Sequence, residues 1–161
     1  MPDRKTPPPE PARTRILLVD DHALFRRGLT ALLETEQDMV VCAESTTHQA
    51  GLDAIAAAKP DLVIADLSVA DSDGLELIKD IKARFPRLPV LALSMHEEAA
   101  YAGRALRAGA CGYVTKQELD ATVLTAIRRV LAGEIYTSKA ISRSLPQPVH
   151  GRRHAREERQ A

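Results

Sequence analysis

Short apolar runs alternate along the chain with longer segments in which apolar residues recur every three or four positions. Residues 16–19 form a continuous apolar run, as expected for a strand that is buried on both faces of a sheet. Phe25, Leu29 and Leu33 follow at the spacing of an amphipathic helix. Further apolar runs predict four more strands, at residues 39–43, 62–65, 90–93 and 112–114.

Helical segments separate these predicted strands. An alanine-rich segment stops before Pro60, because the residue that precedes a proline is pushed out of the helical conformation. Gly109 stands where a helix C-cap glycine belongs. Five successive strand–helix units predict an α/β fold, a doubly wound parallel sheet with helices on both faces and right-handed crossovers. The helices after the first are expected within residues 50–58, 75–81, 97–108 and 119–131.

The two ends of the chain lack this pattern. Residues 1–14 are proline-rich and charged, and we expect a disordered leader there. Residues 135–161 are basic and broken by prolines, which predicts a linker-like, mostly disordered tail after a domain at residues 15–134. Since the chain contains neither an apolar stretch of membrane-spanning length nor a secretory signal, we expect a cytoplasmic protein.

Composition restricts the partners of the domain. The 22 basic and 22 acidic residues cancel, so the overall field does not attract nucleic acid or an anionic membrane. Aromatic residues make up only 3% of the chain and tryptophan is absent, which argues against a stacking platform for single-stranded nucleic acid. Cys42 and Cys111 lie in apolar runs, and we expect two buried free thiols.

Polar residues that suit phosphoryl chemistry follow the predicted strands. Asp20 and Asp21 follow the first strand, Asp66 the third, Ser94 the fourth and Lys116 the fifth. In a doubly wound sheet, ligands bind beyond the carboxyl ends of the strands. Neighbouring carboxylates repel one another, and a hard cation such as Mg²⁺ removes the conflict. One carboxylate can then attack a phosphoryl group, while a hydroxyl and an ammonium stabilise the phosphoryl oxygens.

Four segments carry a family resemblance: RILLVDDHALFRRGL (15–29), PDLVIADLSVADSDGLEL (60–77), LPVLALSMHEEAAYAGRALRAGACGYVTK (88–116) and AIRRVLAGEIYTS (126–138). In this order and spacing they resemble the receiver domain of two-component response regulators, over about residues 15–142. More narrowly, they are similar to receivers of the NarL/FixJ type, which usually precede a LuxR-type helix-turn-helix. The resemblance implies a flavodoxin-like (βα)5 fold with strand order 2-1-3-4-5 and phosphotransfer from a sensor histidine kinase.

The resemblance also implies roles for individual residues. Asp66 is the phosphoacceptor, so the domain catalyses only its own phosphorylation and dephosphorylation and is otherwise not an enzyme. The Mg²⁺ ion is bound directly by Asp21, through water by Asp20, and by Asp66 and the backbone carbonyl of Ser68.

The remaining roles concern the phosphoryl group and the response to it. The resemblance implies that Ser94 and Lys116 contact the phosphoryl oxygens, and that Tyr113 is an aromatic switch residue whose ring moves inward. The chain departs from the usual pattern at Ala70, where the family often has proline, and at Gln117, which follows the lysine. Phosphorylation is expected to change the conformation and to favour a homodimer.

Two other functions remain open at this stage. A haloacid-dehalogenase-type phosphatase also uses an aspartyl nucleophile and Mg²⁺, but it needs a D-x-D motif and a cap domain. A DNA-binding transcriptional regulator that has lost its helix-turn-helix is the second, and we expect no specific DNA binding by this chain alone. Among the histidines, we expect His22 to be a solvated residue at a helix start, and His150 and His154 to belong to a solvated tail.

Overall fold

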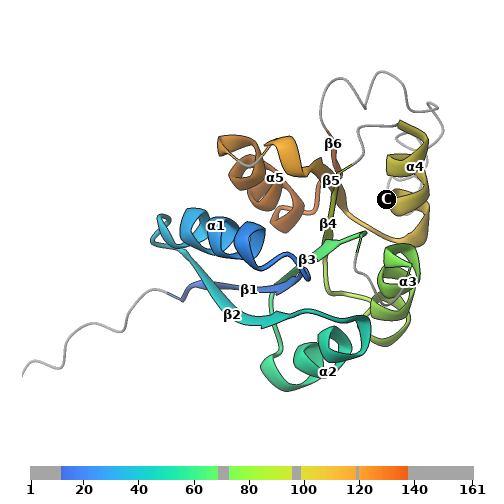
Figure 1. Cartoon of the computed structure of the whole chain (residues 1–161), viewed down its shortest axis with the longest axis horizontal. Helices are drawn as coiled ribbons and strands as arrows, with labels where there is room; N and C mark the ends of the chain where they lie inside the picture. Colours follow the sequence, from blue (N-terminus) through green and yellow to red (C-terminus); the bar gives the residue numbers. More distant parts are fainter. Residues whose placement is uncertain (1–11, 69–72, 96–98, 119, 138–161) are drawn as a thin grey trace, which may run out of the picture.

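Six parallel strands form one sheet in the computed structural model, which describes residues 12–68, 73–95, 99–118 and 120–137. The strand order is β2-β1-β3-β4-β5-β6, so the predicted order 2-1-3-4-5 is confirmed (Figure 1). The strands are β1 (Thr14–Val19), β2 (Met39–Ser45), β3 (Leu62–Asp66), β4 (Val90–Ser94), β5 (Gly112–Thr115) and β6 (Tyr136–Thr137).

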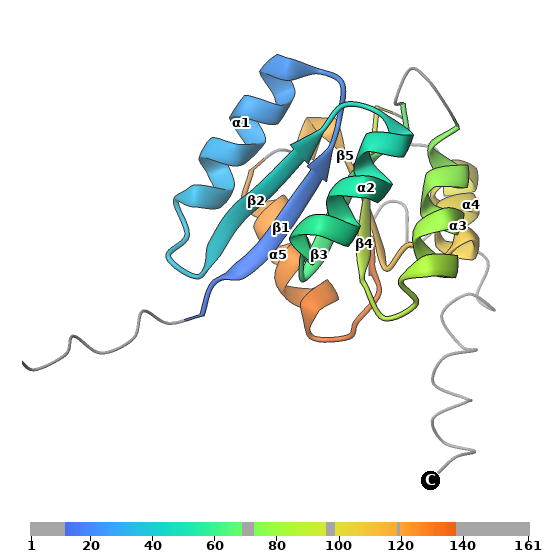
Figure 2. The ribbon, with the colours of Figure 1, turned by 90° about the horizontal axis from the view of Figure 1, so that it is seen from below.

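Helices cover both faces of the sheet, as the alternating pattern predicts. Helices α1 and α5 lie on one face, and α2, α3 and α4 lie on the other (Figures 1 and 2). The helices are α1 (Ala23–Glu34), α2 (His48–Ala58), α3 (Gly74–Arg84), α4 (Ala99–Ala108) and α5 (Ala121–Leu131), with a short 3₁₀ helix, η1 (Lys116–Glu118), before α5.

The sheet separates two apolar cores. Because side chains alternate between the faces of a strand, Ile16 and Leu18 enter the core under α1 and α5, whereas Leu17 and Val19 enter the core under α2, α3 and α4. All four side chains are buried, and full burial of a leucine or isoleucine contributes roughly 1.5–3 kcal/mol. Two-sided burial therefore explains why the sequence of β1 shows no alternation.

The helices differ in how they enter these cores. Helix α3 contributes large side chains, among them Leu77 and Ile78, which are fully buried. The fully buried side chains of α4 are two alanines, Ala102 and Ala105. Among its described residues, α4 thus buries only small side chains completely, while Tyr101 and Leu106 pack against the same core partly buried.

The start of α3 lies very close to the end of β3. Asp73 caps the helix, since its carboxylate accepts a hydrogen bond of 2.9 Å from the Leu75 N–H. A Cβ at Gly74 would lie 2.3 Å from the Cα of Leu67, so the backbones approach closely enough to require glycine. This contact fixes the chain that follows Asp66.

Several details differ from the sequence-based expectations. The sheet has a sixth strand, β6, which pairs with β5, so ordered structure continues past residue 134. A strand of two residues is too short to show a period, which is why the pattern missed it. Cys42 and Cys111 are free thiols, but both are half-buried rather than buried, because Cys42 lies near the edge of the sheet on β2 and Cys111 precedes β5.

Some predictions fall on parts of the chain that the structure does not describe. These are most of the leader and tail, the first residues of the helix expected at 97–108, and Ala70, His150 and His154. Within the described ranges, no helix combines the length and apolarity that crossing a lipid bilayer requires.

Candidate functional site: a carboxylate cluster at the strand ends

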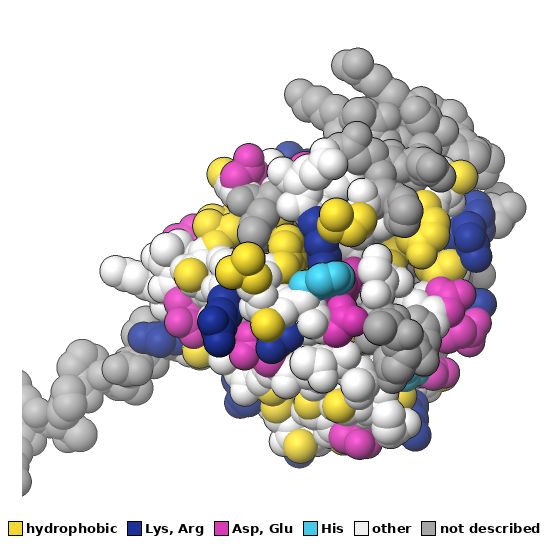
Figure 3. All heavy atoms as spheres, viewed as in Figure 1, with side chains coloured by type: hydrophobic (Ala, Val, Ile, Leu, Met, Phe, Trp, Pro, Cys, Tyr) yellow, Lys and Arg dark blue, Asp and Glu magenta, His cyan; other side chains and the backbone are white. Residues whose placement is uncertain are grey.

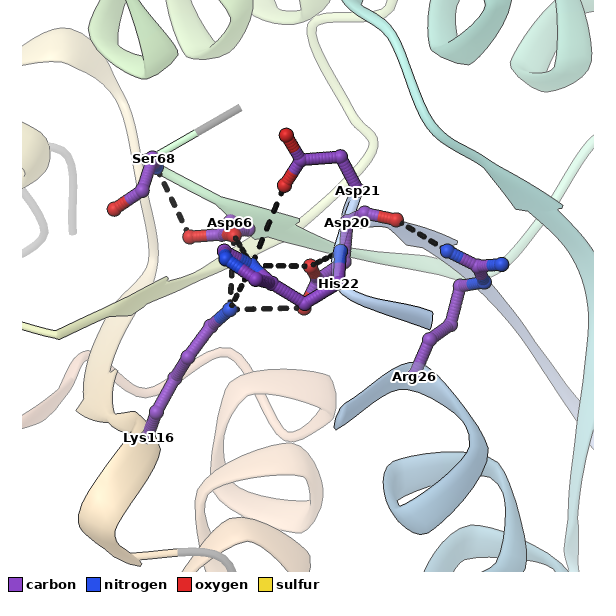
Figure 4. A network of polar contacts seen from close by, with 7 residues as sticks. All are labelled: Asp20, Asp21, His22, Arg26, Asp66, Ser68 and Lys116. Atoms are coloured by element: carbon purple, nitrogen blue, oxygen red, sulfur yellow. Dashed lines mark hydrogen bonds and ion pairs between the residues drawn. The ribbon is translucent and has the colours of Figure 1, made fainter. Parts of the chain in front are cut away.

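The parallel arrangement of the strands brings four charged residues together at the carboxyl ends of the strands. Asp20 and Asp21 follow β1, Asp66 ends β3, and Lys116 follows β5. Figure 4 shows their side chains converging on one point. On this side of the molecule, acidic, basic and histidine side chains gather near the middle among exposed hydrophobic side chains (Figure 3). The sequence-based expectation that these strand-end residues meet is therefore correct.

Lys116 bridges the two buried carboxylates. Its Nζ lies 2.9 Å from Asp66 Oδ2 and 3.2 Å from Asp20 Oδ2. The Lys116 side chain is only 6% exposed, and Asp66 is fully buried. Charges attract strongly in such surroundings because water screens them little. Since the cluster joins three carboxylates to this one ammonium within the described residues, it retains excess negative charge.

Asp66 has a fixed orientation. Its Oδ1 accepts a hydrogen bond of 2.9 Å from the Ser68 backbone N–H, and its Oδ2 accepts one from Lys116. The backbone N–H of Leu67 in turn donates to the Leu93 carbonyl at 2.9 Å, which continues the pairing of β3 with β4 beyond Asp66. The carboxylate is thus held at the end of a rigid strand.

Asp20 is held from both its side chain and its backbone. Its Oδ1 accepts a hydrogen bond of 2.7 Å from the His22 N–H, and its carbonyl accepts one of 2.6 Å from the Arg26 guanidinium. Burial raises the pKa of the Asp20 carboxyl, and the charge of Asp66 adds to this effect, while the His22 N–H and Lys116 oppose it. The ionised form of Asp20 is therefore only partly compensated by its neighbours.

The donor set fits a divalent cation. Asp20, Asp21, His22 and Asp66 each offer one ligand atom, and these atoms lie within 4.8 Å of one another. Asp20 Oδ2 is buried and accepts no hydrogen bond of good geometry from any described residue. A cation would satisfy this oxygen and offset the excess negative charge, and carboxylate oxygens are the ligands that Mg²⁺ prefers.

Ser94 and Tyr113 lie on the strands beside this cluster. Ser94 is fully buried at the end of β4, one residue beyond Leu93, which pairs with Asp66. Tyr113, on β5, is fully buried in the core under α2, α3 and α4. Ser68 is exposed, immediately after the buried end of β3.

Three residues at the start of α1 complete the site and were missed from the sequence. His22 was expected to be solvated; its side chain is 55% exposed, but its Nδ1 lies 3.3 Å from Asp21 Oδ1 and points into the cluster. Phe25 places its ring centroid 4.4 Å from Lys116 Nζ. Arg26 anchors the Asp20 carbonyl. Their place in the sequence could have indicated a role at the site, because they follow the paired aspartates and lie at the start of a helix.

A separate cavity of about 670 Å³ lies at the opposite ends of the strands from the carboxylate cluster. Its lining includes Pro60 and Pro89, which precede β3 and β4, together with the apolar side chains of Ile55, Phe85 and Leu88. It therefore opens at the amino ends of these strands and is no part of the carboxylate cluster.

Residues 16–128 match the family described as the response regulator receiver domain. The chain belongs to this family, and its fold and strand-end carboxylates agree with that membership. It is a receiver domain of two-component signalling, and the phosphatase alternative is correspondingly disfavoured.

Individual relatives place the chain among NarL/LuxR-type regulators. It is 38% identical over 144 residues to the transcriptional activator protein ExaE of Pseudomonas putida, covering 88% of this chain and 67% of ExaE. A LuxR-family two-component response regulator from Aurantimonas sp. SI85-9A1 superimposes with a TM-score of 0.78 at 33% identity, covering 82% of this chain and 94% of that one.

A third similar structure is the isolated receiver domain of RcsB from Salmonella enterica serovar Typhimurium, determined with the phosphomimetic BeF3⁻. Its TM-score is 0.76 at 27% identity, covering 83% of this chain and 99% of that one. The chain spans 56% to 67% of the length of the first three curated relatives.

Proposed function

We propose that Asp66 accepts a phosphoryl group from a phosphohistidine of a sensor histidine kinase. The observation that carries this proposal is the Asp66 carboxylate itself, which is fully buried at the end of β3 and lies 2.9 Å from the Lys116 ammonium. A carboxylate oxygen attacks phosphorus, the P–N bond of the phosphohistidine breaks, and the leaving imidazole takes up a proton. The product is an aspartyl phosphate, which hydrolysis later returns to the carboxylate.

A divalent cation such as Mg²⁺ is the cofactor that this chemistry requires. Asp20, Asp21, Asp66 and the backbone carbonyl of Ser68 are the groups that would hold it, Asp20 through water. The bound ion supplies positive charge to the phosphoryl oxygens. Lys116 offsets the remaining negative charge, and its short contact with Asp66 keeps the ammonium at the reacting carboxylate.

Phosphorylation changes the conformation through Ser94 and Tyr113. Ser94 would donate its hydroxyl to a phosphoryl oxygen, and the ring of Tyr113 would respond to that movement. Support comes from their positions, since Ser94 ends the strand next to β3 and Tyr113 lies on the strand next to Ser94. The domain would exist in two conformations, and the charge of the phosphoryl group would favour one of them. A change at Asp66 would in this way alter the conformation of a distant surface of the domain. Dimerisation of the phosphorylated form is part of the same proposal.

The output is regulatory and is exerted through partners. Each described helix belongs to the layers that cover the sheet, so none of them is available to enter a DNA groove. We therefore expect no sequence-specific DNA binding by this chain alone, and we expect it to meet its kinase in the cytoplasm. The name of ExaE, a transcriptional activator, favours transcription as the process regulated.

Intact-mass measurement after incubation with acetyl phosphate and Mg²⁺ tests the assignment of Asp66. Wild type should gain one acid-labile phosphoryl group, and Asp66→Asn should gain none while keeping its fold. Asp53→Asn is the matched control, because Asp53 is an exposed carboxylate on α2 that accepts a hydrogen bond from Gln49. A phosphoryl group on Asp66→Asn, or its loss in Asp53→Asn, would contradict the proposal.

A further inference from the structure

The imidazole of His22 lies among the oxygens of the carboxylate cluster. Its Nδ1 is 3.2 Å from Asp20 Oδ1, 3.3 Å from Asp21 Oδ1 and 3.5 Å from Asp66 Oδ2. The same atom lies 3.0 Å from Lys116 Nζ. Figure 4 shows the ring directed toward these groups from the turn between β1 and α1.

Hydrogen bonding alone cannot satisfy all of these contacts. In a neutral imidazole, Nδ1 either donates a proton or offers a lone pair. As a donor, Nδ1 would face the ammonium of Lys116. As an acceptor, it takes the hydrogen bond from that ammonium at 3.0 Å, but its lone pair then faces three carboxylate oxygens at 3.2–3.5 Å. A cation among the four groups removes this conflict, because it attracts the nitrogen lone pair and the oxygens together.

The spacing of the atoms fits shared coordination. Neighbouring ligands about 2.1 Å from an octahedral ion lie about 3 Å apart. The distances from Nδ1 to the oxygens of the two directly binding carboxylates, 3.3 Å for Asp21 and 3.5 Å for Asp66, are close to this value. The buried Asp20 Oδ2, which accepts no good hydrogen bond from the described residues, is an independent sign that this cluster is built for a cation.

The turn holds His22 at this position. Its backbone N–H donates to Asp20 Oδ1 at 2.7 Å, and its carbonyl accepts a hydrogen bond of 2.9 Å from the Arg26 N–H at the start of α1. The ring itself is half-exposed, so an ion can exchange its water ligands at this side. The side chain makes no capping hydrogen bond to α1, and the imidazole is directed at the cluster instead.

We propose that His22 Nδ1 is a ligand of the divalent cation and makes the site favour first-row transition ions such as Mn²⁺ over Mg²⁺. Imidazole nitrogen binds transition ions well, whereas Mg²⁺ prefers oxygen. The three carboxylates alone would suit either ion, so the nitrogen decides the preference. This inference rests on the cation site of the proposed function and adds its metal selectivity.

Binding of Mn²⁺ and of Mg²⁺ to the full chain tests the inference, with wild type, His22→Ala and His48→Ala compared by calorimetry. His48 is the matched control, because its imidazole contacts Asp80 at 2.8 Å, away from the cluster. His22→Ala should bind Mn²⁺ at least about tenfold more weakly, with little change for Mg²⁺. His48→Ala should bind both ions as wild type does.

Electron spin echo envelope modulation of bound Mn²⁺ gives a second readout, since it detects a directly coordinated nitrogen. Wild type should show this coupling and His22→Ala should lose it. A coupling that persists in His22→Ala, unchanged Mn²⁺ affinity, or an equal loss of Mn²⁺ and Mg²⁺ would overturn the inference. Failure of the proposed function looks different, because wild type would then bind neither ion or would not be phosphorylated.

Discussion

Lys116 and Phe25 meet across the site, with the ammonium 4.4 Å from the centroid of the aromatic ring. The same ammonium lies 2.9 Å from Asp66. Lys116 follows β5 and Phe25 lies in the first turn of α1, so two distant segments of the chain cooperate at this point. The negative face of the ring attracts the cation and keeps the lysine side chain directed at Asp66.

Replacement of Phe25 by alanine should slow phosphorylation by acetyl phosphate. A cation–π contact contributes about 0.5–2 kcal/mol, which corresponds to a loss of roughly 2- to 30-fold in rate. Phe25→Tyr keeps the aromatic face and should retain most of the rate. Leu24→Ala is the neighbouring control, since Leu24 is 84% exposed. Equal rates for Phe25→Ala and Leu24→Ala would show that the ring does not position Lys116.

Asp20→Asn should stabilise the protein in the absence of divalent ions. Asparagine can keep the hydrogen bond from the His22 N–H. It removes a charge whose burial, together with the repulsion from Asp66, raises the pKa of the Asp20 carboxyl. After addition of Mg²⁺, wild type should be more stable than Asp20→Asn. An ion at one hundred times its dissociation constant stabilises the fold by about 2.7 kcal/mol, and the variant should gain less. Urea unfolding in EDTA and in Mg²⁺ measures both effects. A variant that gains as much from Mg²⁺ as wild type would contradict this account of Asp20.

The pair formed by Asp38 and Arg128 should stabilise the fold only above acidic pH. The hydrogen bond from the Arg128 guanidinium, 2.7 Å long, lowers the pKa of the Asp38 carboxyl in the folded state. A lowered folded pKa gives stabilisation that is present above the unfolded value of about 3.9 and lost as the pH falls through the folded pKa.

Arg128→Ala should therefore unfold slightly more easily than wild type at pH 7 and equally easily well below pH 4. The effect at pH 7 should be small and should shrink with added salt, because both side chains are exposed. Urea titrations at the two pH values provide the measurement. A difference that grows in acid would mean that another group interacts with Arg128.

Gly74→Ala should destabilise the fold and also slow phosphorylation. The added methyl group would overlap the backbone of Leu67, next to Asp66, and such overpacking costs about 1–3 kcal/mol or more. Gly133→Ala separates the steric effect from the conformational one. Gly133 has a positive φ of 89° but no described atom within 4 Å of an added Cβ, so alanine there should leave phosphorylation unchanged. Normal phosphorylation of Gly74→Ala would show that the contact does not fix Asp66.

The sequence was sufficient to predict the parts of the site that depend on periodicity. Continuous apolar runs predict strands buried on both faces, and parallel strands end at a common edge, so the meeting of Asp20, Asp66 and Lys116 follows from the pattern. The glycine at the helix end was also predicted correctly, since Gly109 has a φ of 120°.

Other features depend on tertiary packing and could not be predicted in this way. The contact of Phe25 with Lys116 requires the relative position of α1 and η1, which no local period encodes. The direction of the His22 ring depends on a turn in which the His22 N–H donates to Asp20 Oδ1, and the sequence pattern does not predict this contact. Strand β6 has only two residues and pairs with β5. It can therefore be recognised only from its pairing in the folded sheet, and not from the local sequence.

The small size of the fully buried side chains of α4 has a consequence for how the protein moves. Its fully buried contacts are the methyl groups of Ala102 and Ala105, whereas α3 is held by branched side chains such as Ile78. Tyr101 and Leu106 of α4 pack against the same core only partly buried, so a shift of α4 should lose less dispersion energy than a shift of α3. Its backbone amides should accordingly exchange with deuterium earlier than those of α3. The strand end that we propose as the phosphoryl acceptor is thus combined with a helix that is held less tightly than its neighbour.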